Sequence, residues 1–292
     1  MKLPDEKASK IKKIIGLVNN SEISSIKHTV MELIKIIDNP SSSAKDLKNI
    51  IEIDPPLTAK LLKLTNSAYY GFRRKISEIQ EAIVYIGFDD VKELALRQKV
   101  CELFESNDYL FGYTRISLWK HSVAVALCSK LIYRREFRER GENIYATGLL
   151  HDIGVIVLDQ FLHPRFVDIL KKSKNEKNNL VNTESALLGF NHADIGAAIA
   201  KDWGFPDEMV KAIRNHHNLD SVIDEYTKST LTTYIANYIC QTKSLGYDDS
   251  PYKDKNLFYN CLKKLKIKEV AIELIIDEVK KNIGKMEEAG WF

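Results

Sequence analysis

Apolar residues recur at intervals of three and four positions along almost the whole chain. The stretches LTAKLLKLT (57–65), LWKHSVAVALCSKLI (118–132) and IGAAIAKDWGF (195–205) show this spacing. It matches the turn of an α-helix and places one apolar face of each helix against a core. Convincing two-residue alternation, which is typical of half-buried strands, is absent. The pattern therefore predicts an all-α fold.

Turn signals divide this pattern into separate helices. DNPSSSAKDL (38–47) combines a turn with a serine N-cap, and IDPPL (53–57) places prolines in the first turn of a helix. DWGFPDEMV (202–210) ends one helix at Gly204 and begins the next at Pro206. No linker rich in glycine, serine or proline divides the chain, so we expect helical subdomains that pack as one unit.

The distribution of histidines indicates how the chain is organised. The sequence is poor in histidine up to a change in composition near residues 105–113, and six histidines follow between residues 121 and 217. Five of them, all except His163, occur at helix-like positions in the motifs considered below. We expect an N-terminal helical part (1–110), a helical core (111–224) and a C-terminal helical extension packed on that core (225–292). The lysine-rich helices of the last part carry no chemistry that the sequence identifies.

Composition and charge exclude several classes of protein. Hydrophobic residues make up 45% and charged residues 28% of the 292, as in an ordinary helix-rich globular protein. The net charge of +3 is spread along the chain and gives no electrostatic case for a nucleic-acid partner. The N-terminus, MKLPDEKASKIKK, lacks the apolar centre of a signal peptide. No window approaches the roughly 18 uncharged residues of a membrane span.

These features lead us to expect a cytoplasmic protein that has no membrane partner. The cysteines lie far apart and lack a C-x-x-C spacing, so we expect free thiols in a reducing compartment rather than disulfides or a metal site. They are Cys101, Cys128, Cys240 and Cys261.

The histidines of the middle region are the strongest candidates for chemistry. A single histidine on an apolar helix face is usually a core residue bonded to a backbone carbonyl. Here, however, LLHDIG places Asp152 next to His151 inside an apolar run. A buried carboxylate is costly unless its charge is compensated, and a divalent cation removes that cost. The five histidines are His121, His151, His192, His216 and His217.

Asp152 is the central candidate of this group. On one helix, His151 and Asp152 point about 100° apart, so they bind one metal together only if it lies between their directions. A carboxylate can also use both oxygens and bridge two ions. Imidazole with carboxylate suits transition metals better than magnesium or calcium. We expect one or two ions, with iron or manganese favoured over nickel or zinc.

In their order along the chain, these residues resemble the HD superfamily of metal-dependent phosphohydrolases. Over about residues 20–220 the chain resembles more specifically the HDOD (HD-related output domain) family of bacterial signalling proteins. The resemblance rests on LTNSAYYG (64–71), QEAIVYIG (80–87), LWKHS (118–122), ATGLLHDIG (146–154) and the double histidine after WGFP. It implies an HD-like multi-helix core with an N-terminal helical subdomain packed against it.

The resemblance also implies two metal positions that share Asp152. The first would use His121, His151, Asp152 and, where HD proteins have a distal aspartate, Asn237. An amide oxygen is a weaker ligand than a carboxylate, so we expect weaker binding there. The second would use the set seen in the related HD-GYP phosphodiesterases, namely Asp152, His192, His216 and His217. In an enzyme, a water bridged by Asp152 would be the nucleophile.

Two departures from the HD-GYP pattern weaken the case for catalysis. Val155 occupies the position of the lysine in H-D-x-G-K, and no Gly-Tyr-Pro signature follows the double histidine. Lysine could hold a phosphate or protonate a leaving oxygen, and valine can do neither. We therefore expect a regulatory signal-transduction module that binds metal and an unknown signalling protein or small nucleotide. The alternative is an active metal-dependent phosphohydrolase or phosphodiesterase that acts on a nucleotide or cyclic dinucleotide.

Several residues near these motifs allow two interpretations. Glu184 shares a face with His192 if one helix carries both, and it then orients a ligand; equally, it is an acid that follows Thr183 and complements a helix dipole. Tyr69 and Tyr70 in SAYYGF either line a pocket or, as we favour, are structural aromatics. Trp203 is expected to be a core anchor at a helix terminus.

Overall fold

The computed structural model describes residues 3–21, 23–105, 109–219, 227–248 and 253–292. Within these ranges the regular structure is helical, apart from one isolated antiparallel bridge between Leu110 and Tyr113. The all-α prediction is therefore confirmed. None of the helices in the described ranges is long and apolar enough to cross a membrane.

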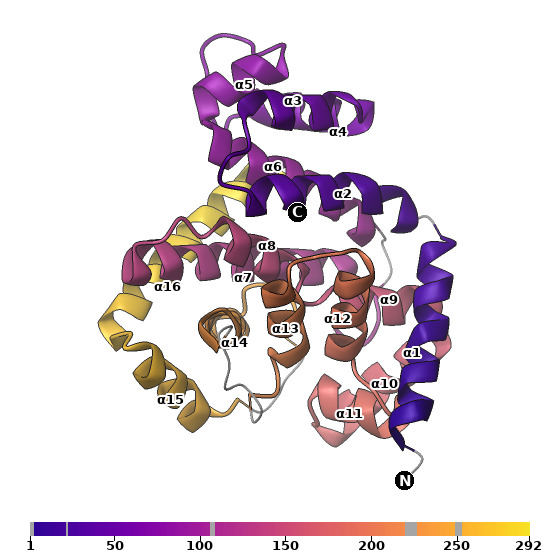
Figure 1. The fold of residues 1–292 in the computed structure, drawn as a ribbon. Helices are drawn as coiled ribbons and strands as arrows, with labels where there is room; N and C mark the ends of the chain where they lie inside the picture. Colours follow the sequence, from indigo (N-terminus) through magenta and orange to yellow (C-terminus); the bar gives the residue numbers. More distant parts are fainter. Residues whose placement is uncertain (1–2, 22, 106–108, 220–226, 249–252) are drawn as a thin grey trace.

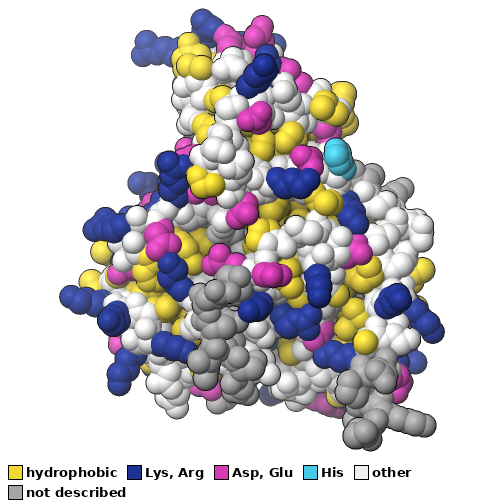
Figure 2. Space-filling view, in the orientation of Figure 1, with side chains coloured by type: hydrophobic (Ala, Val, Ile, Leu, Met, Phe, Trp, Pro, Cys, Tyr) yellow, Lys and Arg dark blue, Asp and Glu magenta, His cyan; other side chains and the backbone are white. Residues whose placement is uncertain are grey.

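The third to fifth helices form the narrow end of the molecule, whereas the first helix runs along its side (Figure 1 and Figure 2). Ser43 caps one of them by accepting a hydrogen bond from the backbone N–H of Asp46, and Asp54 caps the next in the same way at Leu57. Both starts agree with the turn signals in the sequence. The helices are α1 (Leu3–Asn19), α2 (Ile23–Asp38), α3 (Ala44–Glu52), α4 (Pro55–Thr65), α5 (Ile79–Ile86) and α6 (Phe88–Cys101), followed by the 3-10 turn η1 (Glu102–Phe104).

A second group of helices forms the centre of the molecule, where the hairpin of α7 and α8 lies below α2 and α6 (Figure 1). Further along the chain, α12 packs against both α9 and α13. The elements are α7 (Arg115–Ile132), the π-helical turn η2 (Tyr133–Phe137), α8 (Glu142–Leu150), α9 (Ile153–Phe161), α10 (His163–Glu176), α11 (Leu180–Leu188), α12 (His192–Asp202) and α13 (Asp207–Asn215).

The last three helices close the fold around α7. They are α14 (Thr227–Thr242), α15 (Lys255–Leu265) and α16 (Glu269–Glu288), and both α14 and α16 pack against α7. Beyond α16, the ring of Trp291 lies 4.7 Å from that of Tyr69 and 4.2 Å from the guanidinium carbon of Arg97. Tyr70 stacks on Phe72. These contacts favour the structural interpretation of SAYYGF.

A buried ion pair between Glu93 and Lys130 joins the N-terminal helices to the centre of the molecule. Glu93 on α6 and Lys130 on α7 are both 7% exposed, and Glu93 Oε2 lies 2.5 Å from Lys130 Nζ. Burial raises the pKa of Glu93, although Lys130 acts against this shift. The ion pair therefore compensates two charges that neither helix could bury alone.

The structure also bears on the predictions for the cysteines and Trp203, but not on the division of the chain into parts. All four cysteines are free, and three of them are buried. Trp203 is 1% exposed just after α12, which confirms its role as a core anchor. The division into parts at residues 110 and 224 stays a prediction, and the second of these boundaries lies outside the described residues.

Candidate metal centre

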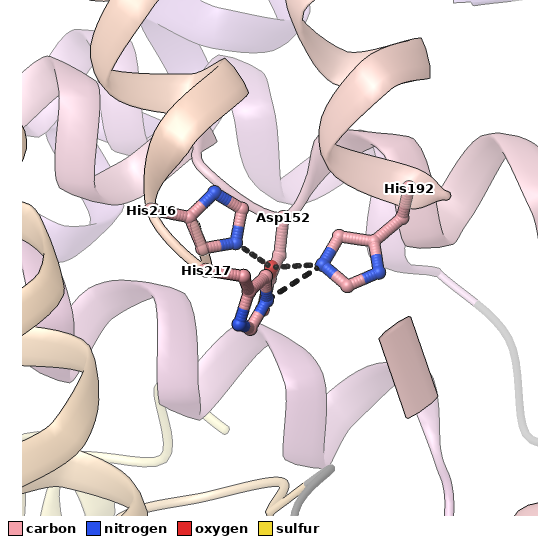
Figure 3. A group of neighbouring side chains, drawn as sticks. All are labelled: Asp152, His192, His216 and His217. Carbon is pink, nitrogen blue, oxygen red and sulfur yellow. Dashed lines mark hydrogen bonds and ion pairs between the residues drawn. The ribbon is translucent and has the colours of Figure 1, made fainter. Parts of the chain in front are cut away.

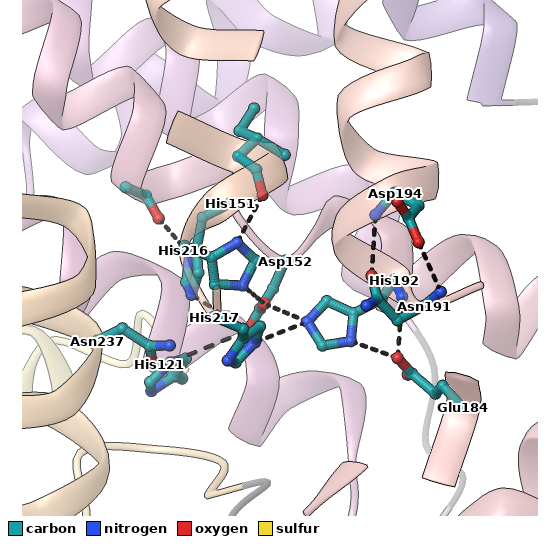
Figure 4. Close-up of polar contacts among 12 residues, drawn as sticks. His121, His151, Asp152, Glu184, Asn191, His192, Asp194, His216, His217 and Asn237 are labelled. Atoms are coloured by element: carbon teal, nitrogen blue, oxygen red, sulfur yellow. Dashed lines mark hydrogen bonds and ion pairs between the residues drawn. The ribbon is translucent and has the colours of Figure 1, made fainter. Parts of the chain in front are cut away.

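The candidate ligands come from separate segments, and most of them lie at helix ends. His121 is inside α7, whereas His151 and Asp152 occupy the junction between α8 and α9. His192 is the first residue of α12. His216 and His217 follow directly after α13. Figure 4 shows that these side chains converge on one buried point, so the fold brings together all six residues that the sequence singled out.

The junction at His151 and Asp152 corrects one sequence interpretation. The two residues do not lie inside a single helix, because α8 ends at Leu150 and α9 begins at Ile153. Asp152 has φ −100° and ψ 14°, in the sparsely populated region where many active-site residues lie. The break turns both side chains to the same side, with His151 Nε2 3.2 Å from Asp152 Oδ2. Apolar periodicity continues through the break and therefore does not reveal it.

The two carboxylate oxygens of Asp152 face different histidines, and Figure 3 shows the side that faces His192 and His216. Oδ2 lies 3.2 Å from Nε2 of His151 and 3.9 Å from Nε2 of His121. Oδ1 lies 3.4 Å from Nε2 of His192 and 3.3 Å from Nε2 of His216. Two groups result, each with its donor atoms within 4.8 Å of one another: His121, His151 and Asp152, and Asp152, His192, His216 and His217. This geometry suits a carboxylate that bridges two ions.

Hydrogen bonds at Nδ1 orient three of the histidine rings. His151 donates to the carbonyl of Gly148 (2.7 Å) and His216 to that of Ile213 (2.6 Å). His192 donates to Oε2 of Glu184 (2.8 Å). A neutral imidazole that donates from Nδ1 presents an unprotonated Nε2, the atom that binds metals. In all three rings Nε2 faces Asp152.

The hydrogen bonds of Glu184 distinguish between the two interpretations that its sequence position allows. It is fully buried, and its Oε2 accepts hydrogen bonds from both Nδ1 and the backbone N–H of His192. Burial opposes a charged ring, but Glu184 and Asp152 outweigh it and raise the pKa of His192. The dipole interpretation is wrong, because α11 is capped by Asn179, well before Glu184. The expected single helix is also wrong, since α11 ends at Leu188.

Asn237 lies where the sequence pattern placed it. It projects from α14 with 4% of its surface exposed, and its Oδ1 is 2.9 Å from Nε2 of His121. The amide therefore sits beside the first group of donors, opposite Asp152 (Figure 4). Its oxygen carries no formal charge, so the only carboxylate in either group is that of Asp152.

The electrostatics of the cluster suit a divalent cation. Burial lowers the pKa of His121 and His216 to about 4 and that of His217 well below its usual value. Burial acts against ionisation of Asp152, but the surrounding histidines overcome it and hold its pKa well below normal. Within the described residues, Oδ1 of Asp152 and Nε2 of His151 and His216 make no hydrogen bond. Imidazoles that burial keeps from ionising, those of His121, His216 and His217, thus lie near a buried anion whose Oδ1 lacks a donor, which is costly without a cation.

Two glycines allow the close helix contacts that assemble the cluster. A Cβ on Gly148 would lie 2.8 Å from Cα of Ala126, so glycine lets α8 approach α7. A Cβ on Gly154 would lie 1.9 Å from the carbonyl oxygen of His192. Glycine at this second position brings α9, which follows Asp152, against the start of α12.

A cavity of about 350 Å³ adjoins the cluster beside His216 and His217. Asn237 and Lys253 are among its lining residues, and Nζ of Lys253 lies 2.7 Å from Oδ1 of Asp248. Val155, by contrast, is 1% exposed inside α9. A lysine therefore reaches the neighbourhood of the cluster from a distant segment rather than from the H-D-x-G-K position. No local motif in the sequence indicated Lys253.

Comparison with known proteins identifies the family. The HDOD domain model matches residues 23–219. This chain belongs to the HDOD domain family. The matched range agrees with the predicted extent of about residues 20–220. An uncharacterised protein of Treponema pallidum (strain Nichols) is 28% identical over 229 residues, which make up 74% of this chain but 42% of that relative. The HDOD chain thus spans less than half the length of the curated relative that it matches.

Solved structures share the fold. An HDOD domain protein of unknown function from Geobacter sulfurreducens is 25% identical, with a TM-score of 0.76 over 90% of each chain. A Shewanella amazonensis protein named “Putative phosphohydrolase” is 23% identical, with a TM-score of 0.67 over 90% of this chain and 92% of its own. The second likeness establishes the fold alone. Together they confirm the predicted HD-like core with packed N-terminal helices.

Proposed function

We propose that this HDOD protein is a regulatory signal-transduction module that holds one or two transition-metal ions at Asp152. The observation that carries the proposal is the buried Asp152, whose Oδ1 makes no hydrogen bond within the described residues although Nε2 of His192 and His216 lies 3.4 and 3.3 Å from it. The first ion would be held by His121, His151 and Asp152, with Asn237 as a weak ligand. The second would be held by Asp152, His192, His216 and His217.

The donor set favours particular metals. Five imidazoles and a single carboxylate suit iron or manganese, with nickel and zinc as alternatives, better than magnesium or calcium. A metal that binds only the folded chain stabilises it by mass action. We propose that the metal fixes the junction of α8 and α9, and that the module acts by binding a partner protein or a small nucleotide.

Metal analysis of protein purified without chelator tests this proposal. We expect a transition metal to co-purify, and we expect Asp152→Ala, which removes the ligand shared by both positions, to lose most of it. The matched control is His28→Ala, which removes an exposed histidine outside the cluster and should keep the metal. Chelation should lower the Tm of the wild type but not that of Asp152→Ala. The proposal is wrong if no transition metal co-purifies, or if Asp152→Ala keeps the metal content of the wild type.

A phosphohydrolase is the second candidate, and one observation favours it. The cavity beside His216 and His217 contains Lys253, whose ammonium group pairs with Asp248. If a phosphate replaced Asp248 as its partner, Lys253 would take the place of the lysine missing at Val155. The S. amazonensis structural neighbour is also named for this activity. A bound metal would lower the pKa of a water and polarise a phosphoryl oxygen. Asp152 would then position that water, and Lys253 the phosphate.

An activity assay separates the two candidates. Protein purified anaerobically and loaded with iron or manganese is tested on cyclic dinucleotides and nucleotides, alongside Asp152→Ala and Asn237→Asp. The regulatory proposal predicts no turnover by the wild type or by Asn237→Asp, even though the latter restores a carboxylate. Turnover by the wild type that disappears in Asp152→Ala would establish the enzyme instead.

A further inference from the structure

A second cavity, of about 680 Å³, lies apart from the histidine cluster. It is lined by the end of α2, the start of α6, the turn η2 and the first residues of α8, α13 and α14. None of the candidate metal ligands lines it. Its size is within the range of roughly 300–1,000 Å³ that is common for small-molecule sites.

The cavity and the cluster lie at opposite ends of the same helices. Glu142 begins α8, which ends next to His151, and Glu208 lies in the first turn of α13, which ends next to His216. At 1.5 Å per residue, the nine residues of α8 separate the two places by about 14 Å. Tyr133 likewise follows α7, the helix that carries His121.

Two buried polar groups in the cavity wall have no partner. Glu142 is 6% exposed and its Oε1 makes no hydrogen bond within the described residues. Tyr133 is 7% exposed and its hydroxyl is equally unbonded. The N-terminal dipole of α8 favours a negative charge at Glu142 but supplies no donor to Oε1. Buried polar groups in native proteins are almost always bonded, so this pair indicates a ligand with N–H donors.

The charges around these groups define the ligand further. Lys228 Nζ lies 2.6 Å and 2.8 Å from the two carboxylate oxygens of Glu139, and Lys92 Nζ lies 3.0 Å from Oδ1 of Asp89. Acids of the protein therefore already compensate both lysines. Among the described lining residues that make no ion pair, the acids Asp38, Glu142 and Glu208 outnumber the single base Arg140. The uncompensated charge of the cavity wall is negative.

The aromatic rings of the cavity wall already accept ammonium groups. Lys228 Nζ is 5.1 Å from the ring centre of Tyr133, and Lys92 Nζ is 4.6 Å from that of Phe88. These two ring faces attract cations, and the protein's own lysines occupy them. The size of the cavity, its charge and its unbonded acceptors agree on one class of ligand.

We propose that this cavity is a second ligand site, which binds a small organic cation through a primary ammonium or guanidinium group. The cation donates hydrogen bonds to Oε1 of Glu142 and to the hydroxyl oxygen of Tyr133. The site requires no metal at the histidine cluster, so it stands independently of the function proposed above.

Calorimetric titration of the full chain with agmatine, putrescine and spermidine tests this site, with uncharged 1,4-butanediol as the reference compound. We expect at least one amine to bind with a Kd below about 1 mM. Glu142→Gln keeps the shape of the side chain and removes its charge, and should weaken binding at least tenfold. Tyr133→Phe should weaken it about threefold. Glu136→Gln is the matched control, because Glu136 lies in the turn η2 with Tyr133 but does not line the cavity.

The folded state of the variants is checked in the same samples. Without ligand, Glu142→Gln should melt no lower than the wild type, because it removes an uncompensated buried charge. If it fails to fold, Tyr133→Phe carries the test alone. The proposal is overturned if no amine binds, if the diol binds as tightly, or if the variant that folds binds as tightly as Glu136→Gln.

Discussion

Replacing Gly154 by alanine tests whether helix contact assembles the metal centre. The new Cβ would lie 1.9 Å from the carbonyl oxygen of His192, whereas real Cβ atoms essentially never approach another atom within 3.0 Å. The start of α9 and the start of α12 must therefore move apart by about 1 Å. This movement separates Asp152, just before α9, from His192, whose Nε2 lies 3.4 Å from its Oδ1.

The magnitude follows from two opposing terms. Alanine favours helix over glycine by about 1 kcal/mol, whereas overpacking a close-packed core costs about 1–3 kcal/mol and sometimes more. The Cβ would clash with backbone atoms, which can move little, so we take the cost of overpacking as about 3 kcal/mol. Subtracting the helix preference of about 1 kcal/mol leaves an expected net loss of about 2 kcal/mol. For a chain of this size that is a fall in Tm of about 4–8 °C. Metal sites tolerate errors of only about 0.2 Å, so affinity should fall at least tenfold.

Thermal melts and metal titrations of Gly154→Ala provide the measurement. Gly16→Ala on α1 is the matched control, because a Cβ there meets nothing within 4 Å. It should raise stability by about 0.5–1 kcal/mol and leave metal binding unchanged. If the Gly154 variant behaves like this control in both assays, the contact between α9 and α12 does not hold the site together.

Three further substitutions test other parts of the structure. Glu184→Gln should lower metal affinity about 10–100-fold, measured by competition with a chelator, and an unchanged affinity would exclude its role in orienting His192. Lys130→Met leaves Glu93 buried without its cation and should cost about 3–5 kcal/mol in urea unfolding, whereas exchanging both residues for methionine should recover most of the loss; no recovery would contradict the pairing. For Asp54, burial opposes ionisation, but bonds to Lys99 and to the start of α4 outweigh it and lower the pKa. Asparagine caps a helix about as well as aspartate does, so Asp54→Asn removes the ion pair with Lys99 and keeps the cap. The contribution of that pair, about 1 kcal/mol, is present above about pH 4 and is lost as the pH falls through the lowered value. Asp54→Asn should therefore be less stable than the wild type at pH 7 and equal to it at pH 2, and a difference independent of pH would refute the assignment.

The fold was predictable because the sequence signals that define each helix act over short distances along the chain. Apolar spacing and caps such as Ser43 and Asp54 act within a few residues, so sequence alone places the helices. Apolar spacing does not reveal the break at Asp152, because both α8 and α9 are buried and the apolar pattern continues through the junction between them. The histidines were found by motif order, and their distances to Asp152 required the folded chain.

Long-range contacts were the part that sequence could not supply. The sequence suggests the correct partner for Glu184, which is His192, but suggests it on the assumption that one helix carries both residues. In the structure α11 ends before Gly189, and a turn separates it from His192. Lys253 reaches the cavity beside the cluster from the segment just before α15, and nothing in its local sequence sets it apart. Glu142 resembles any acid at a helix start, and only its burial without a partner distinguishes it.

The contact of Trp291 with Tyr69 and Arg97 has a consequence for the order of folding. It joins residues 69 and 97 to a residue beyond α16, so it forms only after residue 291 has been synthesised. The donors of the second metal group, from Asp152 to His217, all emerge before α14. Asn237 emerges later, on α14 itself. If the cluster holds metal as proposed, an ion could meet the donors of the second group during synthesis, whereas the first group gains Asn237 only after α14 has emerged.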